Sequence, residues 1–458
     1  MVEFPFKEIV KIDLTKKKLL IPNMHPYGAR LLSACLRGFE IDANVLPTYV
    51  NLELGKQFTS GKECFPCQVT ISDILNYLLK EKNRLKDKFN PKDYVYLMPE
   101  SDGPCRFGMY NKFQRLVLNS FKDFKDIYIS YFTTEDSYST KGVLPDEKAT
   151  KFKKIGYFAM VLADVFDRIV WRVRPYEIKE GITEEIIDDK LKEIESIFEA
   201  EAQDLPFKKV FNVVESTAVE AKKLINPSIK RKPRIGIVGE IYLRTHSPSN
   251  QFVIKKLEKN GAEVVNASLC EWINFVTFEN IRKTKLFLKL LYTEKLFKYI
   301  PATLKKLISL NLERQYQLIL MKKTYGIVLK YLDIQKDHDV AELEKYLENN
   351  SIYSYEVGTE AALSIAGALC YIEEGFNGVV NVFPFSCMPS TITSAILKPI
   401  MRRKNFPYLD LSYDGTNQPN RDIAIKTFIF QAMQHRQIDF SWKIILIVLK
   451  LFLWKIQN

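Results

Sequence analysis

Apolar residues alternate between short continuous runs and helical spacing along two stretches of this 458-residue chain. The first stretch predicts strands at 18–22, 43–47 and 94–98, with helices at 27–38 and 71–79. The second predicts strands at 234–239, 261–265, 378–383 and 408–411, with helices from about 249 and at 358–374. Strands that alternate with helices are typical of parallel sheets covered by helices. We therefore expect an α/β protein with two or more lobes that face each other.

The region between the two stretches, from about 152 to 224, has a helical pattern and ends at a basic, proline-containing linker. The expected organisation is an N-terminal α/β lobe (1–150), a helical segment (151–226), a C-terminal α/β lobe (234–435) with a basic helical insertion (276–332), and a hydrophobic tail (436–458). The apolar run of the tail, 442–454, contains lysines and is shorter than the roughly 20 residues that span a bilayer. A packing helix is expected there, with an interfacial helix as the alternative and no transmembrane span.

The net charge of +12 is concentrated in the insertion, where residues 276–330 hold twelve Lys or Arg against three Glu. Such a surface suits an anionic ligand, for example a nucleotide-bearing thioester, or an acidic redox partner; a solvated helical face is the alternative. No nucleic-acid motif accompanies the charge, so no nucleic-acid partner is expected. A Walker A sequence is missing, and Gly236 and Gly239 do not have dinucleotide-fingerprint spacing. We do not expect the chain to hydrolyse ATP.

Four of the seven cysteines lie in Pro- or Gly-containing segments that follow predicted strands or open helices. Cys64 and Cys67 form a C-x2-C pair, whereas Cys105 and Cys387 are single and each follow a strand. Because ligands bind at the carboxyl ends of parallel strands, we expect the four thiolates to converge on a cleft and bind one tetrahedral metal or one cubane cluster.

The remaining cysteines differ from these four. Cys35 and Cys370 lie in apolar helical runs and are expected in the core, whereas for Cys270 a core position and a position at the edge of the site both stay open. An odd number of dispersed cysteines argues against a disulfide framework. Since no signal peptide is visible either, we expect a reducing, cytoplasmic location.

An iron–sulfur cluster is favoured over zinc, since structural zinc usually has two close cysteine pairs and only one is present. Arg106 and Lys62 are candidates for the surroundings of the cofactor, beside Cys105 and Cys64. Candidates for acid or base catalysis are Glu63, Asp102 and Glu360, together with Glu100 and Asp414. Each of these carboxylates has a cap or an exposed surface charge as its alternative role.

The segments 61–67, 101–112 and 383–389, with 237–242 and 412–415, resemble the 2-hydroxyacyl-CoA dehydratase family, in particular the dehydratase-like region of acyl-CoA dehydratase activase-related proteins. The likeness extends from about residue 18 to 434. It implies several flavodoxin- or Rossmann-like lobes and an oxygen-sensitive [4Fe–4S] cluster, with a double-cubane cluster in some relatives. It also implies Cys64, Cys105 and Cys387 as ligands, with Cys67 as a fourth.

The resemblance further implies an activity. In this family a separate ATP-hydrolysing activase injects one electron, which serves to dehydrate a 2-hydroxyacyl-CoA or to carry out a difficult reduction. This chain lacks the ATP-binding region of the large fused members, so an activase partner is expected, with an acyl-CoA-like ligand and a homo- or heterodimeric state. The alternatives are a non-catalytic electron carrier or assembly subunit with a closed four-thiolate cluster, and a zinc-stapled structural or binding protein.

Overall fold

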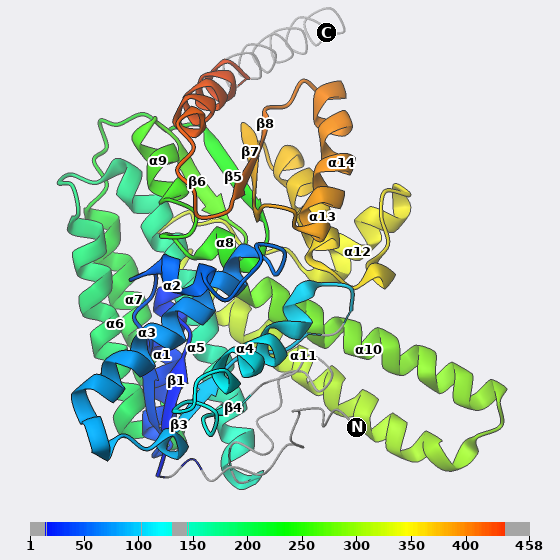
Figure 1. The fold of residues 1–458 in the computed structure, drawn as a ribbon. Coiled ribbons are helices and arrows are strands. Elements are labelled where there is room, and N and C mark those ends of the chain that lie inside the picture. The colour runs from blue at the N-terminus through cyan, green and yellow to red at the C-terminus, as the bar shows by residue number, and fades with distance from the viewer. Residues whose placement is uncertain (1–13, 15, 102, 131–143, 145, 436–458) are drawn as a thin grey trace, which may run out of the picture.

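The computed structural model describes residues 14, 16–101, 103–130, 144 and 146–435, which form two four-stranded sheets that lie one above the other (Figure 1). The first sheet has the order β2-β1-β3-β4 and consists of β1 (Lys18–Ile21), β2 (Asp42–Val45), β3 (Tyr94–Leu97) and β4 (Tyr128–Ser130). The second has the order β6-β5-β7-β8 and consists of β5 (Arg234–Gly239), β6 (Glu263–Asn266), β7 (Gly378–Pro384) and β8 (Tyr408–Tyr413). All pairs are parallel, which confirms the predicted α/β class with two parallel-sheet lobes.

The central strands show that both sheets are covered on both faces. Every residue of β3 is buried, and in β7 all but Phe383 are buried. Strands covered on both faces have continuous apolar runs rather than alternation, as the sequence of both strands shows. The carboxyl ends of the strands of each sheet meet at one edge, where loops lead into helices.

The helices of the first lobe are α1 (Pro26–Gly38), α2 (Leu52–Lys56), α3 (Phe65–Leu85) and α4 (Tyr110–Asn119). The prediction of a loop at Cys67 is wrong, because α3 begins at Phe65 and Cys67 lies in its first turn. Pro66 favours this start, since proline lacks an N–H and has a backbone angle suited to the first helical turn. The loop therefore ends at Cys64.

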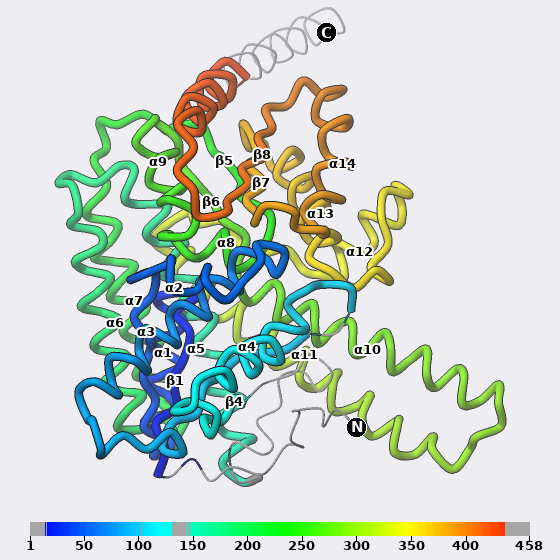
Figure 2. Tube along the Cα trace, viewed as in Figure 1, coloured from blue at the N-terminus to red at the C-terminus, as the bar shows by residue number. Residues whose placement is uncertain are grey.

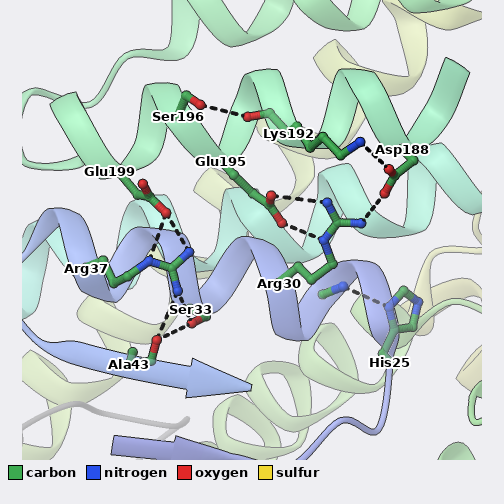
Figure 3. Close-up of polar contacts among 11 residues, drawn as sticks. His25, Arg30, Ser33, Arg37, Ala43, Asp188, Lys192, Glu195, Ser196 and Glu199 are labelled. Atoms are coloured by element: carbon green, nitrogen blue, oxygen red, sulfur yellow. Dashed lines mark hydrogen bonds and ion pairs between the residues drawn. The ribbon is translucent and has the colours of Figure 1, made fainter. Parts of the chain in front are cut away.

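The helical segment consists of α5 (Asp146–Val173), α6 (Ile182–Glu201) and α7 (Phe207–Lys223), and α1 packs against α5 and α6. Figure 3 shows two arginines of α1 facing α6: Arg30 binds Asp188 and Glu195, and Arg37 binds Glu199. Helices α1, α5, α6 and α7 also contribute to one apolar core. The segment is thus attached to the first lobe by both packing and ion pairs.

The second lobe contains α8 (Ile241–Thr245), α9 (Val253–Lys259), α13 (Glu360–Glu373) and α14 (Met388–Arg403). Between β6 and β7 the chain forms α10 (Leu269–Thr293), α11 (Ile300–Val328) and α12 (Val340–Asn349). Helices α10 and α11 form a hairpin that extends away from both sheets (Figures 1 and 2). The helix expected from about 249 begins at Val253 because the short α8 precedes it.

The described chain also contains an α-helical stretch at 420–435. Its short 3-10 helices are η1 (Lys86–Lys88), η2 (Pro91–Asp93), η3 (Arg106–Met109), η5 (Arg174–Tyr176), η6 (Ala202–Asp204), η7 (Phe297–Tyr299) and η8 (Tyr355–Val357). Among the described residues, no helix has the length and apolar character needed to cross a membrane. The hydrophobic tail, 436–458, lies outside the described residues.

Candidate metal centre

Three of the predicted cysteines occupy the same kind of position, the residue that precedes a helix. Cys64 caps α3, Cys105 caps η3 and Cys387 caps α14. The N-terminus of a regular helix carries a partial positive charge that favours a nearby anion such as a thiolate. Cys105 and Cys387 also follow β3 and β7, the corresponding strands of the two sheets.

One side chain holds the three cysteine loops together. The guanidinium group of Arg106, the residue after Cys105, donates hydrogen bonds to the carbonyl oxygens of Lys62 and Ser386. These carbonyls lie two residues before Cys64 and one residue before Cys387. Lys62 itself is exposed, and its carbonyl is the group that enters this contact. Arg106 thus connects the two lobes at the cysteine loops.

The thiols of Cys64, Cys105 and Cys387 share the same two carboxylate neighbours, Glu240 and Glu360. Burial is the largest cause of the raised pKa of each thiol, and the charges of the two carboxylates raise all three further. For Cys387 the pKa rises to about 12. Without a bound metal these thiols are therefore protonated at neutral pH, and a metal would have to displace their protons.

Cys67 has different surroundings. Its side chain is 1% exposed and belongs to an apolar cluster of the first lobe. Burial raises its pKa, followed by the charges of Cys64 and Glu63, and neither Glu240 nor Glu360 contributes. The fold thus groups three of the four predicted cysteines around the carboxylates and leaves the fourth inside the lobe.

Glu240 is a residue that the sequence pattern did not single out as a site candidate. It follows β5 directly and caps α8, accepting hydrogen bonds from the backbone N–H groups of Tyr242 (3.1 Å) and Leu243 (2.8 Å). Burial, and then the charge of Glu360, raise the pKa of Glu240 to about 7. Its place after a strand is the signal that selected Cys105 and Cys387, and it applies equally to a carboxylate.

Glu360, a predicted candidate, is the first residue of α13 and follows the capping residue Thr359. Burial raises the pKa of its carboxyl group. The charge of Glu360 in turn contributes, after burial, to the raised pKa of Glu240. Tyr110 is a further neighbour, and its hydroxyl group forms a hydrogen bond with Cys64 that opposes the effect of burial on the pKa of the thiol.

The other acidic candidates have local partners. Glu63 accepts hydrogen bonds from the backbone and hydroxyl groups of Ser60, both at 3.0 Å. Glu100 binds Asn111 at 2.7 Å and pairs with Lys112. Asp414 accepts two hydrogen bonds from the turn at Thr416. Asp102 lies outside the described residues.

The three cysteines outside the predicted set of ligands lie in or against apolar cores. Cys35 is fully buried, and Cys270 is 1% exposed within the same core. The question left open for Cys270 is answered by its backbone N–H, which donates to Asp164 at 2.8 Å in that interior. Cys370 is half-buried against the core of the second lobe.

A cavity of about 1380 Å³ adjoins the cysteine loops. It exceeds the roughly 300–1,000 Å³ that is typical of ligand pockets. Its walls include the carboxyl ends of β1, β3 and β5, the first turns of α10 and a stretch of α11. Cys105, Tyr110, Glu240 and Glu360 line it on one side, Lys305 and Lys306 of α11 line it elsewhere, and most of the surface between is apolar.

The thiols of Cys64, Cys105 and Cys387 do not form a site for a single metal ion in this structure. Within the stretches of chain that the structure describes, no group of three or more His, Cys, Asp or Glu is arranged to hold one metal ion. A cubane binds each thiolate through a different iron, so its ligands lie farther apart than those of a single ion. Cys64, Cys105 and Cys387 would hold such a cluster, on loops that Arg106 fixes relative to one another.

Comparisons with known proteins leave the chain without a match, both among protein-family models and among curated proteins. The resemblance noted in the sequence therefore rests on its cysteine motifs.

Proposed function

We propose that this chain is the iron–sulfur subunit of a two-component system of the 2-hydroxyacyl-CoA dehydratase or ATP-dependent reductase type. It accepts a single electron from a separate ATP-hydrolysing activase and uses it to dehydrate or reduce an acyl-CoA-like substrate. The observation that carries the proposal is the joining of three cysteine loops by Arg106 beside Glu240, Glu360 and a large, mostly apolar cavity.

The cluster is the first element of the proposal. A [4Fe–4S] cluster held by Cys64, Cys105 and Cys387 supplies a low-potential electron and an iron without a cysteine ligand that acts as a Lewis acid. Tyr110 would hydrogen-bond to the Cys64 sulfur, and Arg106 would hold the loops in place. Phe107, which also lines the cavity, limits the access of water to this side.

The cavity supports the assignment of the substrate class. Its apolar walls suit an acyl chain, and the ammonium groups of Lys305 and Lys306 suit the phosphates of a nucleotide-bearing thioester. Lys153 is a less available cation, because it pairs with Glu313 at 2.8 Å. The substrate would thus lie with its reacting end near Cys105 and its anionic end near α11.

Glu240 is the proposed proton donor. Loss of a hydroxyl group as water needs a proton at the leaving oxygen, and a carboxyl group with a pKa of about 7 is suited to donate one near neutral pH. The backbone N–H groups at the start of α8 fix its orientation. Burial, and then the negative charge of Glu360, raise the pKa of Glu240 and so favour its protonated form.

The test is anaerobic purification of the full chain, followed by iron, sulfide and zinc analysis and an EPR spectrum of the reduced protein. We expect about four irons and four sulfides per chain, and near eight for a double-cubane cluster. Cys105→Ala and Cys387→Ala should each lose most of the iron, whereas the matched core variant Cys270→Ala should keep it. One zinc without sulfide would refute the proposal in favour of the zinc-stapled alternative.

The electron-carrier alternative depends on Cys67, which lies within one helical turn of Cys64. If all four thiols bind, the cluster is closed and no iron is available to a substrate. The Cys67→Ala variant distinguishes the electron carrier from the dehydratase or reductase subunit. Retained iron with binding of an acyl-CoA in calorimetry supports the dehydratase or reductase role, whereas loss of iron with no acyl-CoA binding in the parent chain supports the carrier.

A further inference from the structure

The end of the α10–α11 hairpin exposes an unusual number of large apolar side chains. We call residues 283–308 the hairpin tip. Nine exposed residues of this kind lie within it: Leu286, Phe287, Leu290, Tyr292, Leu296, Phe297, Tyr299, Leu304 and Ile308. The rest of the described chain is more than ten times as long and exposes thirteen. Leu286 and Tyr292 are 69% and 72% exposed, so these side chains lack the burial that apolar residues normally have.

The hairpin tip is also cationic. It contains seven lysines, namely Lys283, Lys285, Lys289, Lys295, Lys298, Lys305 and Lys306, against the single acidic residue Glu294. Within the described residues none of these lysines has an ion pair, whereas Arg282 at the base of the tip pairs with Glu279 and Glu344. Lys305 and Lys306 also line the cavity, so the positive charge of the other five lysines is available to an external anion.

Lysines and apolar side chains alternate most closely where the two helices join. Lys295, Leu296, Phe297, Lys298 and Tyr299 follow one another, and all are exposed. The Phe297 ring packs edge-on against Tyr292 with a centroid distance of 6.1 Å. The Lys298 ammonium lies 4.8 Å from the centroid of the Tyr299 ring. Side chains with apolar bodies and charged ends in one place are suited to the boundary between lipid headgroups and acyl chains.

We propose that the hairpin tip docks on the surface of an anionic lipid bilayer. Charge complementarity favours this occupant, because the five lysines of the tip that do not line the cavity have no ion pair among the described residues and match anionic headgroups, while the exposed Phe and Leu side chains enter the interface. The kind of cation argues against a protein partner, since the cores of protein interfaces are enriched in Arg and depleted in Lys. A second tip of the same charge would be repelled.

The position of the hairpin allows this contact. Figures 1 and 2 show that α10 and α11 extend well beyond the two sheets, so a flat surface can meet the tip before it meets either lobe. Neither helix can cross the membrane, so the contact is peripheral. The inference does not depend on the proposed function, since it requires neither a cluster nor a substrate.

The test is co-sedimentation of the full chain with phosphatidylcholine vesicles that contain or lack phosphatidylglycerol. At a salt concentration of about 0.1 M we expect binding to the anionic vesicles at least about tenfold tighter than to neutral ones, and a clear loss in high salt. The combined Lys285→Gln, Lys289→Gln, Lys295→Gln and Lys298→Gln variant should weaken binding by about tenfold or more. Phe287→Ser with Phe297→Ser should weaken it without changing its salt dependence.

The controls use exposed residues away from the hairpin. Lys222→Gln, Lys223→Gln and Lys259→Gln together, and separately Ile178→Ser, should bind as the parent chain does, and circular dichroism should show all variants folded. Residues 436–458 stay intact in every variant. If the tip variants bind the vesicles as tightly as the parent chain, another part of the protein binds lipid and the proposal is overturned. Equal binding to neutral and anionic vesicles would overturn the proposal as well. So would light scattering that shows a dimer for the parent chain and a monomer for the lysine variant.

Discussion

The first lobe places β1 between β2 and β3, and the second places β5 between β6 and β7 in the same order. Corresponding positions can therefore be compared. After the third strand of each lobe in chain order stands a cysteine, Cys105 or Cys387. The helix before that strand directly follows Cys64 in one lobe and begins with Glu360 in the other, and the first strand leads to His25 or Glu240.

The comparison separates what topology determines from what residue type determines. Both lobes bring these positions to the carboxyl edge of a parallel sheet, which is why side chains distant in sequence meet. The first lobe supplies two thiols there, and the second supplies one thiol and two carboxylates. His25 does not join them: it accepts from Gly28 at 3.0 Å and pairs with Asp167 of α5 at 2.9 Å (Figure 3 shows the first contact). The carboxylates beside the thiols thus come from the second lobe, although His25 of the first lobe also lines the cavity.

The largest expected effect is at Gly239, where the second lobe turns from β5 towards Glu240. Its φ is +120°, and a Cβ there would lie 2.1 Å from the carbonyl oxygen of Val382. Gly239→Ala should cost about 3 kcal/mol or more of unfolding free energy, from strain and overpacking. Gly181→Ala, at φ +86° with no atom within 4 Å, should cost about 1 kcal/mol. Equal urea midpoints for the two variants would show that β7 moves to accommodate the methyl group.

Arg106→Ala tests whether the hydrogen bonds of Arg106 hold the two lobes together at the cysteine loops. Loss of its hydrogen bonds to Lys62 and Ser386 should cost about 2 kcal/mol and speed alkylation of Cys387 severalfold. Arg115→Ala is the matched control, because Arg115 also donates to two carbonyls, those of Lys125 and Ile127, but only within the first lobe. It should destabilise the chain and leave the alkylation rate of Cys387 unchanged. The same rate for both variants would refute the role of Arg106.

Glu240 should make the stability of the chain depend on pH. Its pKa rises from 4.5 to about 7 on folding, so between these values the native chain keeps a proton that the unfolded chain has lost. Stability from this group is therefore present below pH 4.5 and declines as the pH rises towards 7. Relative to the parent chain, Glu240→Gln should gain about 1–3 kcal/mol of unfolding free energy between about pH 5 and 7.5.

Two further observations check this prediction. Glu360→Gln removes a negative charge beside Glu240, so the window in which stability declines should move to lower pH. Denaturant unfolding curves at several pH values give both results. If the parent chain and Glu240→Gln show parallel pH profiles, Glu240 is ionised in the native chain and cannot be the proton donor.

The smallest expected effect concerns the contact between the first lobe and its helical segment. Arg30 binds Asp188 and Glu195, each at 2.6 Å, and its side chain is 29% exposed. Because solvent and salt screen such pairs, Arg30→Ala should cost about 1 kcal/mol, and less at high salt. A thermal melt at two salt concentrations measures this. A cost that does not change with salt would indicate that packing of the arginine stem is the main contribution.

The sequence allowed β3 and β7 to be predicted because they are buried on both faces and are therefore continuous apolar runs. It did not predict β4, which has only three residues, all of them half-buried. It also selected the cysteine segments, since Pro and Gly mark the turns after those strands. It did not predict that Cys67 enters α3, because Pro66 is compatible with both a loop and a first helical turn. The grouping of Glu240 and Glu360 with the thiols depends on contacts between lobes, which local spacing does not encode. The sequence also did not predict that Leu286 is exposed, since a leucine at helical spacing is typical of a buried face.

Strand pairing in the second lobe also determines the order in which the chain can assemble. Ile235 pairs with Gly378, whereas in the first lobe Lys18 pairs with Tyr94. During synthesis the first sheet is complete once β4 has emerged, but β5 must wait for the hairpin and α13 before it meets β7. Cys387 emerges later still. The three thiols therefore come together only after the chain has been synthesised as far as Cys387, and a cofactor that needs all three can be inserted only after that point.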